Sequence, residues 1–145
     1  MSPEDATRYN QYWDDVSKGL DTDTRVKLNQ WKYRPDADLY NKYKNVYNNP
    51  KYYNQETGAI NWPANDGFVS GSQKIETLGV GTKLDRYGQP TGKFLAPKSD
   101  SFPSRSLAPH SENAPYYNYE IIEELEVTSG KIAPWFGQPG GGHNL

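Results

Sequence analysis

Three short motifs carry side chains that could bind or transform a ligand. Arg86 lies in DRYG and Arg105 in FPSRSLAP, and a guanidinium group can grip an anion through two parallel hydrogen bonds. Gln138 lies in PWFGQPGGG, where it is the only polar side chain between Trp135 and the glycines. Its amide offers donors and an acceptor without a charge, which suits a sugar hydroxyl or a carboxamide.

Each motif also has a purely structural interpretation. DRYG taken alone is typical of a β-turn in which Arg86 is solvated. Arg105, in a proline-bounded loop, is typical of a surface residue, and Phe94 in GKFLAP is typical of the core. The segment around Gln138 is either an ordinary loop or a backbone that the glycines allow to approach a ligand closely.

Several chemistries are not supported by the sequence. The chain has no cysteine, and His110 and His143 stand far apart without an HxH or HExxH pattern, so we expect no metal site. GxSxG, GxGxxG and P-loop patterns are absent. The 16 Lys and Arg against 18 Asp and Glu form no basic run, so we expect no nucleic-acid partner. No stretch approaches the length of a membrane span.

The elements that must position these residues change along the chain. The mean hydropathy of -0.99 is low, but an aromatic share of 14% predicts a folded chain with Tyr and Trp in its core. Ser2 followed by Pro3 and two acids predicts a helix start, and Gly19 its end. Further helical segments are expected at 24–31 and 38–47. Apolar residues recur at helical spacing in the first helix: Ala6, Tyr9, Trp13 and Val16.

Proline and glycine become frequent after about Gly58, and strands are expected from there on. They are placed at 74–80, within GVGTKLDRYG, and at 119–127, where a helix is the alternative. We therefore predict an α+β fold, with a helical N-terminal segment (1–57) packed on a small, mainly antiparallel, twisted β core (58–145) of the same domain.

The order of the motifs resembles the TNT (tuberculosis necrotizing toxin-like) family of NAD(P)+ glycohydrolases. The resemblance spans about residues 60–142, and six segments carry it: NWPANDGF, DRYG, GKFLAP, RSLAP, PYYNYE and APWFGQPGGG. It implies a β core of the TNT type. It also implies an enzyme that hydrolyses the nicotinamide–ribose bond of NAD+ or NADP+ to nicotinamide and ADP-ribose, with no further cofactor.

The resemblance also implies roles for individual residues. Arg86 is expected to contact the substrate phosphates and to take part in catalysis, and Arg105 to line the site. Phe94 is expected near the nicotinamide end, and Tyr87, in the same motif as Arg86, among the substrate-binding residues. Gln138 is expected to be important for activity.

One position departs from the family pattern. Members often show PYHxY where this chain has PYYNY, so Tyr117 replaces a histidine and is expected to serve in catalysis in its place. Strand alternation puts Tyr117 and Tyr119 on one face and Tyr116 on the other. Because nicotinamide leaves a pyridinium cation as a neutral molecule, no proton has to be delivered to it. A residue that does not titrate near neutral pH is therefore tolerable there.

Two alternatives to hydrolysis remain. One is an ADP-ribosyltransferase, for which an acidic residue among Glu123–Glu126 would be the catalytic group. The other is a catalytically inactive dinucleotide-binding or interaction module, which the loss of the histidine favours.

The family resemblance implies a monomeric toxin domain used in competition between bacteria, with a cognate immunity protein as partner. The N-terminus lacks the basic-then-apolar layout of a signal peptide. We therefore expect a secreted or delivered effector that acts in the target cytoplasm and depletes NAD there.

Overall fold

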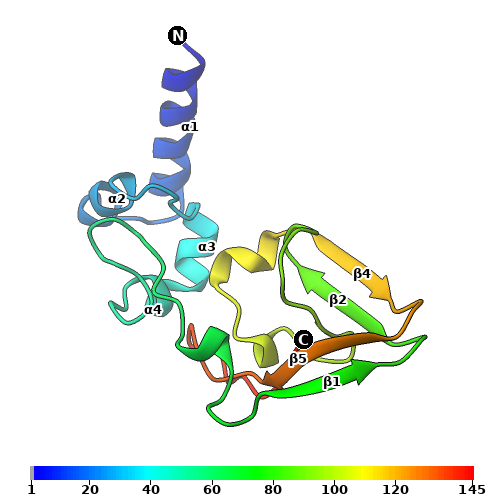
Figure 1. Cartoon of the computed structure of the whole chain (residues 1–145). Coiled ribbons are helices and arrows are strands. Elements are labelled where there is room, and N and C mark those ends of the chain that lie inside the picture. The colour runs from blue at the N-terminus through cyan, green and yellow to red at the C-terminus, as the bar shows by residue number, and fades with distance from the viewer. Residues whose placement is uncertain (1) are drawn as a thin grey trace. The chain divides into compact units, whose positions relative to one another are not determined.

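The computed structural model describes residues 2–145, which divide into two compact units. We call residues 2–61 the helical unit and Trp62–Leu145 the β-rich unit (Figure 1). Helices together with small antiparallel sheets confirm the predicted α+β class. The assignment of both parts to one domain, with a change at 57/58, stays a prediction.

The helical unit contains four α-helices, and side chains cap the first three. The carboxyl or hydroxyl oxygens of Ser2, Asp21 and Asp36 each accept a hydrogen bond from the amide three residues later, at 3.1, 2.7 and 2.8 Å. The segment expected at 38–47 is broken at Tyr43, which leaves the helical region with φ −115° and ψ 29°. The helices are α1 (Pro3–Ser17), α2 (Thr22–Asn29), α3 (Ala37–Lys42) and α4 (Lys44–Tyr47).

Aromatic side chains form the core of the helical unit, as the composition predicts. Trp31, Tyr40, Tyr47 and Tyr53 are each at most 5% exposed. The rings of Trp31 and Tyr53 stack with their centroids 5.8 Å apart. Gly58 lies against Trp31, where a Cβ atom would come within 2.5 Å of the indole.

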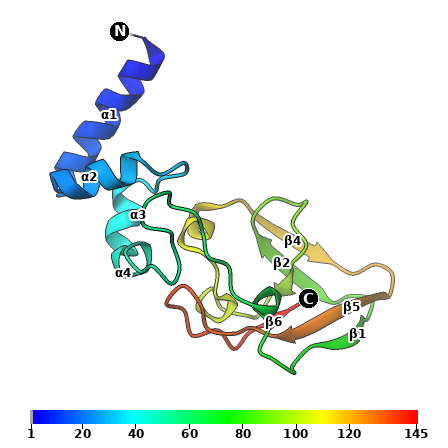
Figure 2. The same ribbon diagram turned by 60° about the vertical axis from the view of Figure 1, so that its left-hand side comes forward.

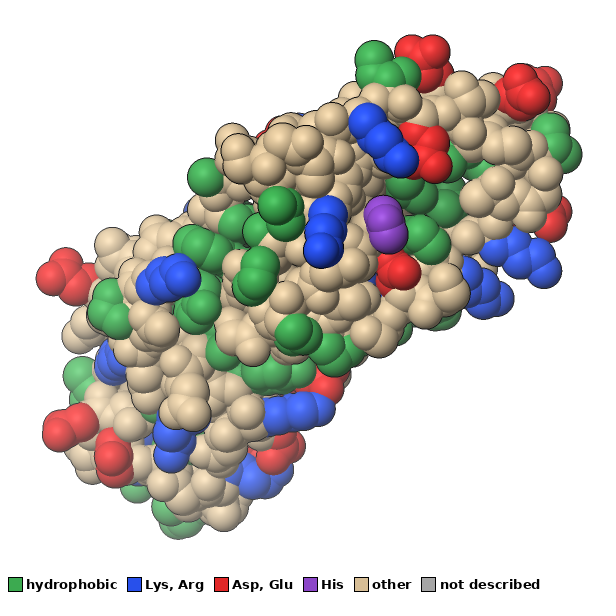
Figure 3. Space-filling model, turned by 90° about the horizontal axis from the view of Figure 1, so that it is seen from below, with side chains coloured by type: hydrophobic (Ala, Val, Ile, Leu, Met, Phe, Trp, Pro, Cys, Tyr) green, Lys and Arg blue, Asp and Glu red, His purple; other side chains and the backbone are tan. Residues whose placement is uncertain are grey.

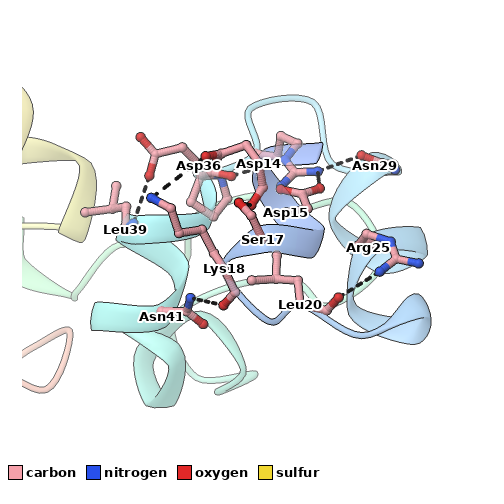
Figure 4. Close-up of polar contacts among 12 residues, drawn as sticks. Asp14, Asp15, Ser17, Lys18, Leu20, Arg25, Asn29, Asp36, Leu39 and Asn41 are labelled. Atoms are coloured by element: carbon pink, nitrogen blue, oxygen red, sulfur yellow. Dashed lines mark hydrogen bonds and ion pairs between the residues drawn. The ribbon is translucent and has the colours of Figure 1, made fainter. Parts of the chain in front are cut away.

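Polar contacts tie the end of α1 to the chain around α3. Asp15, which is 2% exposed, pairs with both terminal nitrogens of Arg34 at 2.8 and 3.1 Å. Lys18 binds Asp38 at 2.7 Å, and the Lys18 carbonyl accepts a hydrogen bond from Asn41 at 2.9 Å (Figure 4). Because Asp15 is buried, its pairing with Arg34 satisfies a charge that would otherwise destabilise the unit.

The β-rich unit contains two small antiparallel sheets, one of order β1-β5-β6 and the other of order β3-β2-β4. Figures 1 and 2 show the β2/β4 pair beside the β1/β5 pair, with the chain passing from β4 into β5. In the second sheet Arg86 stands opposite Tyr117. The strands are β1 (Lys74–Leu78), β2 (Lys83–Tyr87), β3 (Ala96–Pro97), β4 (Tyr116–Glu120), β5 (Leu125–Lys131) and β6 (His143–Asn144).

Two local predictions are corrected by this topology. Residues 119–127 do not form one strand, because the chain leaves β4 at Glu120 and starts β5 at Leu125 to reach the other sheet. DRYG is not a β-turn, because its first three residues belong to β2 and only Gly88, with φ 138°, begins the turn. Backbone pairing with β4 and β3 outweighs the local turn preference.

The β-rich unit also contains short 3-10 helices and a clasp, which is our name for the two backbone hydrogen bonds between Leu95 and Leu145. Leu145 donates its amide hydrogen to the Leu95 carbonyl at 2.9 Å and accepts from the Leu95 amide at 3.3 Å. The end of the described chain is thus fixed to the loop that precedes β3. The 3-10 helices are η1 (Asn65–Gly67), η2 (Pro103–Arg105) and η3 (Pro109–Asn113).

Charged groups are mixed on the face drawn in Figure 3, where basic and acidic side chains alternate with hydrophobic ones and form no continuous basic patch on that face. Among the described residues, none of the helices has both the length and the apolar character that crossing a membrane requires.

Candidate active site

A cavity of about 750 Å³ lies within the β-rich unit. This volume suits a small molecule with several polar groups. Four of the residues singled out from the sequence line it: Arg86, Tyr87, Phe94 and Arg105. The structure therefore brings together side chains from DRYG, GKFLAP and RSLAP. The lining residues fall within 62–67, 85–96, 105–115 and 132–136, with Asn144 in addition.

Arg86 is oriented by the loop that follows β2. Its Nε donates to the Gln89 carbonyl at 2.7 Å, and one terminal nitrogen donates to the Phe94 carbonyl at 2.9 Å. Gly92 makes room for the group, since a Cβ atom there would lie 1.6 Å from the other terminal nitrogen. Within residues 2–145 the Arg86 guanidinium has no carboxylate partner, so its positive charge in the half-buried cavity wall is not neutralised.

Arg105 is held differently. One terminal nitrogen lies 2.6 Å from a carboxylate oxygen of Asp85, and the other donates to the Asp100 carbonyl at 2.9 Å. Arg105 and Asp85 are 7% and 1% exposed, so the two opposite charges neutralise each other in a buried pair. The guanidinium also lies over the Tyr87 ring, 5.1 Å from its centroid. Arg105 thus lines the cavity as half of an ion pair.

Tyr116 completes this pair from the neighbouring strand. Its hydroxyl donates a hydrogen bond to the second carboxylate oxygen of Asp85. The hydrogen bond raises the pKa of the Tyr116 hydroxyl, which keeps the donor proton on the phenol. The side chain of Asp85 therefore joins β2, β4 and the loop of Arg105.

Aromatic rings contribute to the apolar part of the cavity lining. Phe94 meets Phe68 edge to face with centroids 6.5 Å apart. Phe136, 2% exposed, meets Trp62 in the same manner at 6.0 Å. Rings of this kind offer a flat surface on which a heteroaromatic base or a sugar can pack.

Backbone strain is concentrated around the cavity. Four residues other than glycine have positive φ within the described chain, and three of them, Asp66, Ser106 and Phe136, line the cavity. Such conformations are unfavourable for residues with a Cβ atom and cluster at functional sites. Their coincidence here marks the cavity as the candidate active site.

Comparison with known proteins agrees with this placement. Residues 77–145 match the family model described as tuberculosis necrotizing toxin. Residues 77–145 thus resemble a TNT domain, the name we use for them.

Two relatives of the TNT domain support the assignment. The chain is 38% identical over 97 residues to the conidial surface nicotinamide adenine dinucleotide glycohydrolase nadA of Aspergillus fumigatus. The match covers 59% of this chain and 42% of that protein, so the chain spans less than half of the relative's length. A solved structure of tuberculosis necrotizing toxin complexed with its immunity factor is 29% identical, with a TM-score of 0.57 over 72% of this chain and 58% of that one.

Gln138 of the TNT domain does not line the cavity. The backbone N–H of Gln138 donates to the Trp135 carbonyl at 2.9 Å. This hydrogen bond closes a tight turn in which Phe136 and Gly137 have φ of 52° and 71°. The turn directs Phe136 into the cavity wall and leaves Gln138 half-buried beside it. Tyr117, opposite Arg86 on β4, is 37% exposed and is also outside the lining.

The glycines after Gln138 approach the protein's own chain. A Cβ atom at Gly140 would lie 2.7 Å from the Ile132 carbonyl oxygen, and one at Gly142 would lie 2.8 Å from an Asp100 carboxylate oxygen. The close approach that the sequence suggested for a ligand is thus used to pack this segment of the TNT domain against its neighbours.

Sequence reasoning missed three cavity residues of the TNT domain. The sequence pattern indicates a turn at Asp85 and does not mark Ser106 or His110 as site residues. Partial desolvation lowers the pKa of His110, which favours the neutral imidazole. Within residues 2–145, no three His, Asp or Glu side chains gather as a metal ion would require. The signal available was the proximity of Ser106 and His110 to the Arg105 motif.

Proposed function

We propose that the chain is an NAD(P)+ glycohydrolase. The observation that carries the proposal is Arg86: a fixed guanidinium without a carboxylate partner, in a cavity walled by aromatic rings, within a TNT domain. A dinucleotide offers a charged diphosphate for the guanidinium and flat bases and sugars for the rings. The curated relative, which bears the name of a glycohydrolase, supports the same assignment.

The proposed reaction needs little proton chemistry. Water adds to C1′ of the nicotinamide ribose, and the C1′–N bond breaks with its electron pair passing to the pyridinium nitrogen. Neutral nicotinamide leaves, ADP-ribose keeps the new hydroxyl, and the proton from water goes to solvent. Binding of the diphosphate by Arg86 and of the base beside Phe94 would hold the ribose in place for this step. In this scheme Arg105 and Tyr87 line the cavity between the part that binds the diphosphate and the part that binds the base.

Transfer of ADP-ribose to a protein is less well supported. The acidic residues considered for that reaction, Glu123, Glu124 and Glu126, are exposed and lie outside the cavity lining. We therefore assign water as the acceptor.

The direct test is to incubate the purified chain with NAD+, and separately with NADP+, and to quantify nicotinamide and ADP-ribose by chromatography. We expect equal amounts of both products. A folded protein that binds the dinucleotide without releasing nicotinamide would instead be an inactive binding module. ADP-ribose attached to protein, in place of free ADP-ribose, would identify a transferase.

Gln138 and Tyr117 are retained as proposed catalytic residues. The turn of Gln138 follows directly on Phe136 of the cavity wall, and we propose that Gln138 contacts the substrate from there. We expect Gln138→Ala to lower kcat about tenfold or more with little change in KM, as for a contact made in the transition state. Steady-state kinetics would measure this, with the exposed Gln73→Ala as the matched control. An unchanged kcat would leave Gln138 as a turn residue only.

The biological role follows the same proposal. The solved relative is described as complexed with its immunity factor. We propose that this chain likewise acts as a delivered toxin that depletes the dinucleotide in the cytoplasm of a target cell, and that it acts as a monomer. A cognate immunity protein would protect the producing cell by covering the cavity.

A further inference from the structure

Three buried side-chain polar atoms of the described residues have no hydrogen-bond partner: one Asp85 carboxylate oxygen, Arg105 Nε and Ser106 Oγ. All three residues line the cavity and are at most 9% exposed. The Asp85 oxygen is the one that faces Arg105 at 2.6 Å, so its charge is compensated. Arg105 Nε and Ser106 Oγ remain, one a donor and the other both donor and acceptor.

Ser106 also has an unfavourable backbone. Its φ and ψ are both 46°, in the left-handed region, directly after the 3-10 helix η2. Glycine is the usual residue where a helix ends in this conformation. A serine at this position therefore combines backbone strain with a buried hydroxyl that nothing in the protein satisfies. Both features disfavour the unliganded protein, and a ligand contact to the hydroxyl would offset the second.

The charges in the cavity divide it into two regions. Arg86 has no carboxylate partner and suits a phosphate, whereas the charge of Arg105 is neutralised by Asp85. A second phosphate beside Arg105 would meet the Asp85 carboxylate and be repelled. The region around Arg105 Nε and Ser106 Oγ therefore suits a neutral hydrogen-bonding group.

Building on the proposed glycohydrolase function, we infer that Ser106 is a substrate-binding residue whose hydroxyl, with Arg105 Nε, binds a neutral polar group of the dinucleotide. The shared chemistry is that of a ribose hydroxyl or of the nicotinamide carboxamide. This assignment gives the two arginines different roles: Arg86 binds the diphosphate, and Arg105 binds a neutral polar group of the dinucleotide.

The test compares Ser106→Ala and Ser106→Gly with the wild-type chain, with the exposed Ser99→Ala as the matched control. We expect both Ser106 variants to raise KM for NAD+ by about five- to twentyfold, which corresponds to roughly 1 to 1.8 kcal/mol. The melting temperature without substrate should be unchanged or higher, and highest for glycine, which relieves the strain. A lower melting temperature with an unchanged KM would show a structural hydroxyl and overturn the inference.

Inhibition by ADP-ribose, which lacks nicotinamide, distinguishes a ribose hydroxyl from the nicotinamide carboxamide as the group bound by Ser106. A loss of affinity in Ser106→Ala equal to that for NAD+ indicates a ribose hydroxyl, and a loss confined to NAD+ indicates the carboxamide. Weaker inhibition by inorganic pyrophosphate in Ser106→Ala would contradict the inference, because the group bound would then be a phosphate.

Titration calorimetry with NAD+ keeps the inference separate from the proposed function. If the wild-type chain releases no nicotinamide, the glycohydrolase proposal fails. The inference is still decided by whether Ser106→Ala binds NAD+ more weakly than the wild-type chain and Ser99→Ala. Equal affinities would overturn it whether or not the chain is active.

Discussion

Replacing Asp85 with alanine should lower the free energy of unfolding by about 3–5 kcal/mol, because Arg105 would be left as an unpaired charge in a buried position. Asp85 is 1% exposed and meets both Arg105, at 2.6 Å, and the Tyr116 hydroxyl. Urea denaturation followed by circular dichroism measures the change. A decrease below 1 kcal/mol would mean that the ion pair contributes little to the fold.

A double variant shows whether the unpaired charge is the cause. Asp85→Leu combined with Arg105→Met removes both charges and keeps apolar volume, so we expect it to recover most of the stability lost in the single variant. If the double variant is no more stable than Asp85→Ala, the loss arises from packing and from the Tyr116 hydrogen bond. Its activity is a separate matter, because Arg105 also lines the cavity.

Replacing Arg86 with alanine should lower kcat/KM for NAD+ by one to two orders of magnitude, mainly through KM. A hydrogen bond to a charged group contributes about 1.5–3 kcal/mol, and no other cation is held by the same two carbonyl oxygens. Steady-state kinetics of nicotinamide release measures the effect. Arg8→Ala, which removes an arginine 77% exposed on α1, is the matched control.

A second variant tests orientation without removing the charge. In Gly92→Ala the new Cβ atom would lie 1.6 Å from an Arg86 nitrogen, so the guanidinium must move away from the Phe94 and Gln89 carbonyls. We expect kcat/KM to fall in the same direction as in Arg86→Ala, with an unaltered circular dichroism spectrum. Wild-type activity in both variants would remove Arg86 from the proposed substrate-binding group.

Local signals predicted the elements that depend on few residues. The helix beginning after Ser2 and ending before Gly19 follows from capping and from the positive φ of glycine, and both are observed. The apolar spacing in α1 predicts the helix but not burial, because Tyr9 and Trp13 are 54% and 52% exposed. Periodicity identifies a face of a helix, whereas its burial depends on what packs there.

The site was predictable in part. Motif order brought Arg86, Phe94 and Arg105 to attention, and the structure places them around one cavity. The carboxylate partner of Arg105 was not predictable from spacing, because Asp85 reaches it only through the pairing of β2 with β4 and the return of the η2 loop. The left-handed backbone conformation of Ser106 was also not predictable, because serine carries no local signal for positive φ.

The clasp between Leu145 and Leu95 has a consequence for how the protein is made. Leu95 lies next to Phe94, whose carbonyl holds Arg86, and cavity residues extend from Trp62 to Asn144. Synthesis proceeds from the N-terminus, so this wall can close only after residue 145 has emerged from the ribosome. The cavity is therefore incomplete on every nascent chain until residues 144 and 145 have been synthesised.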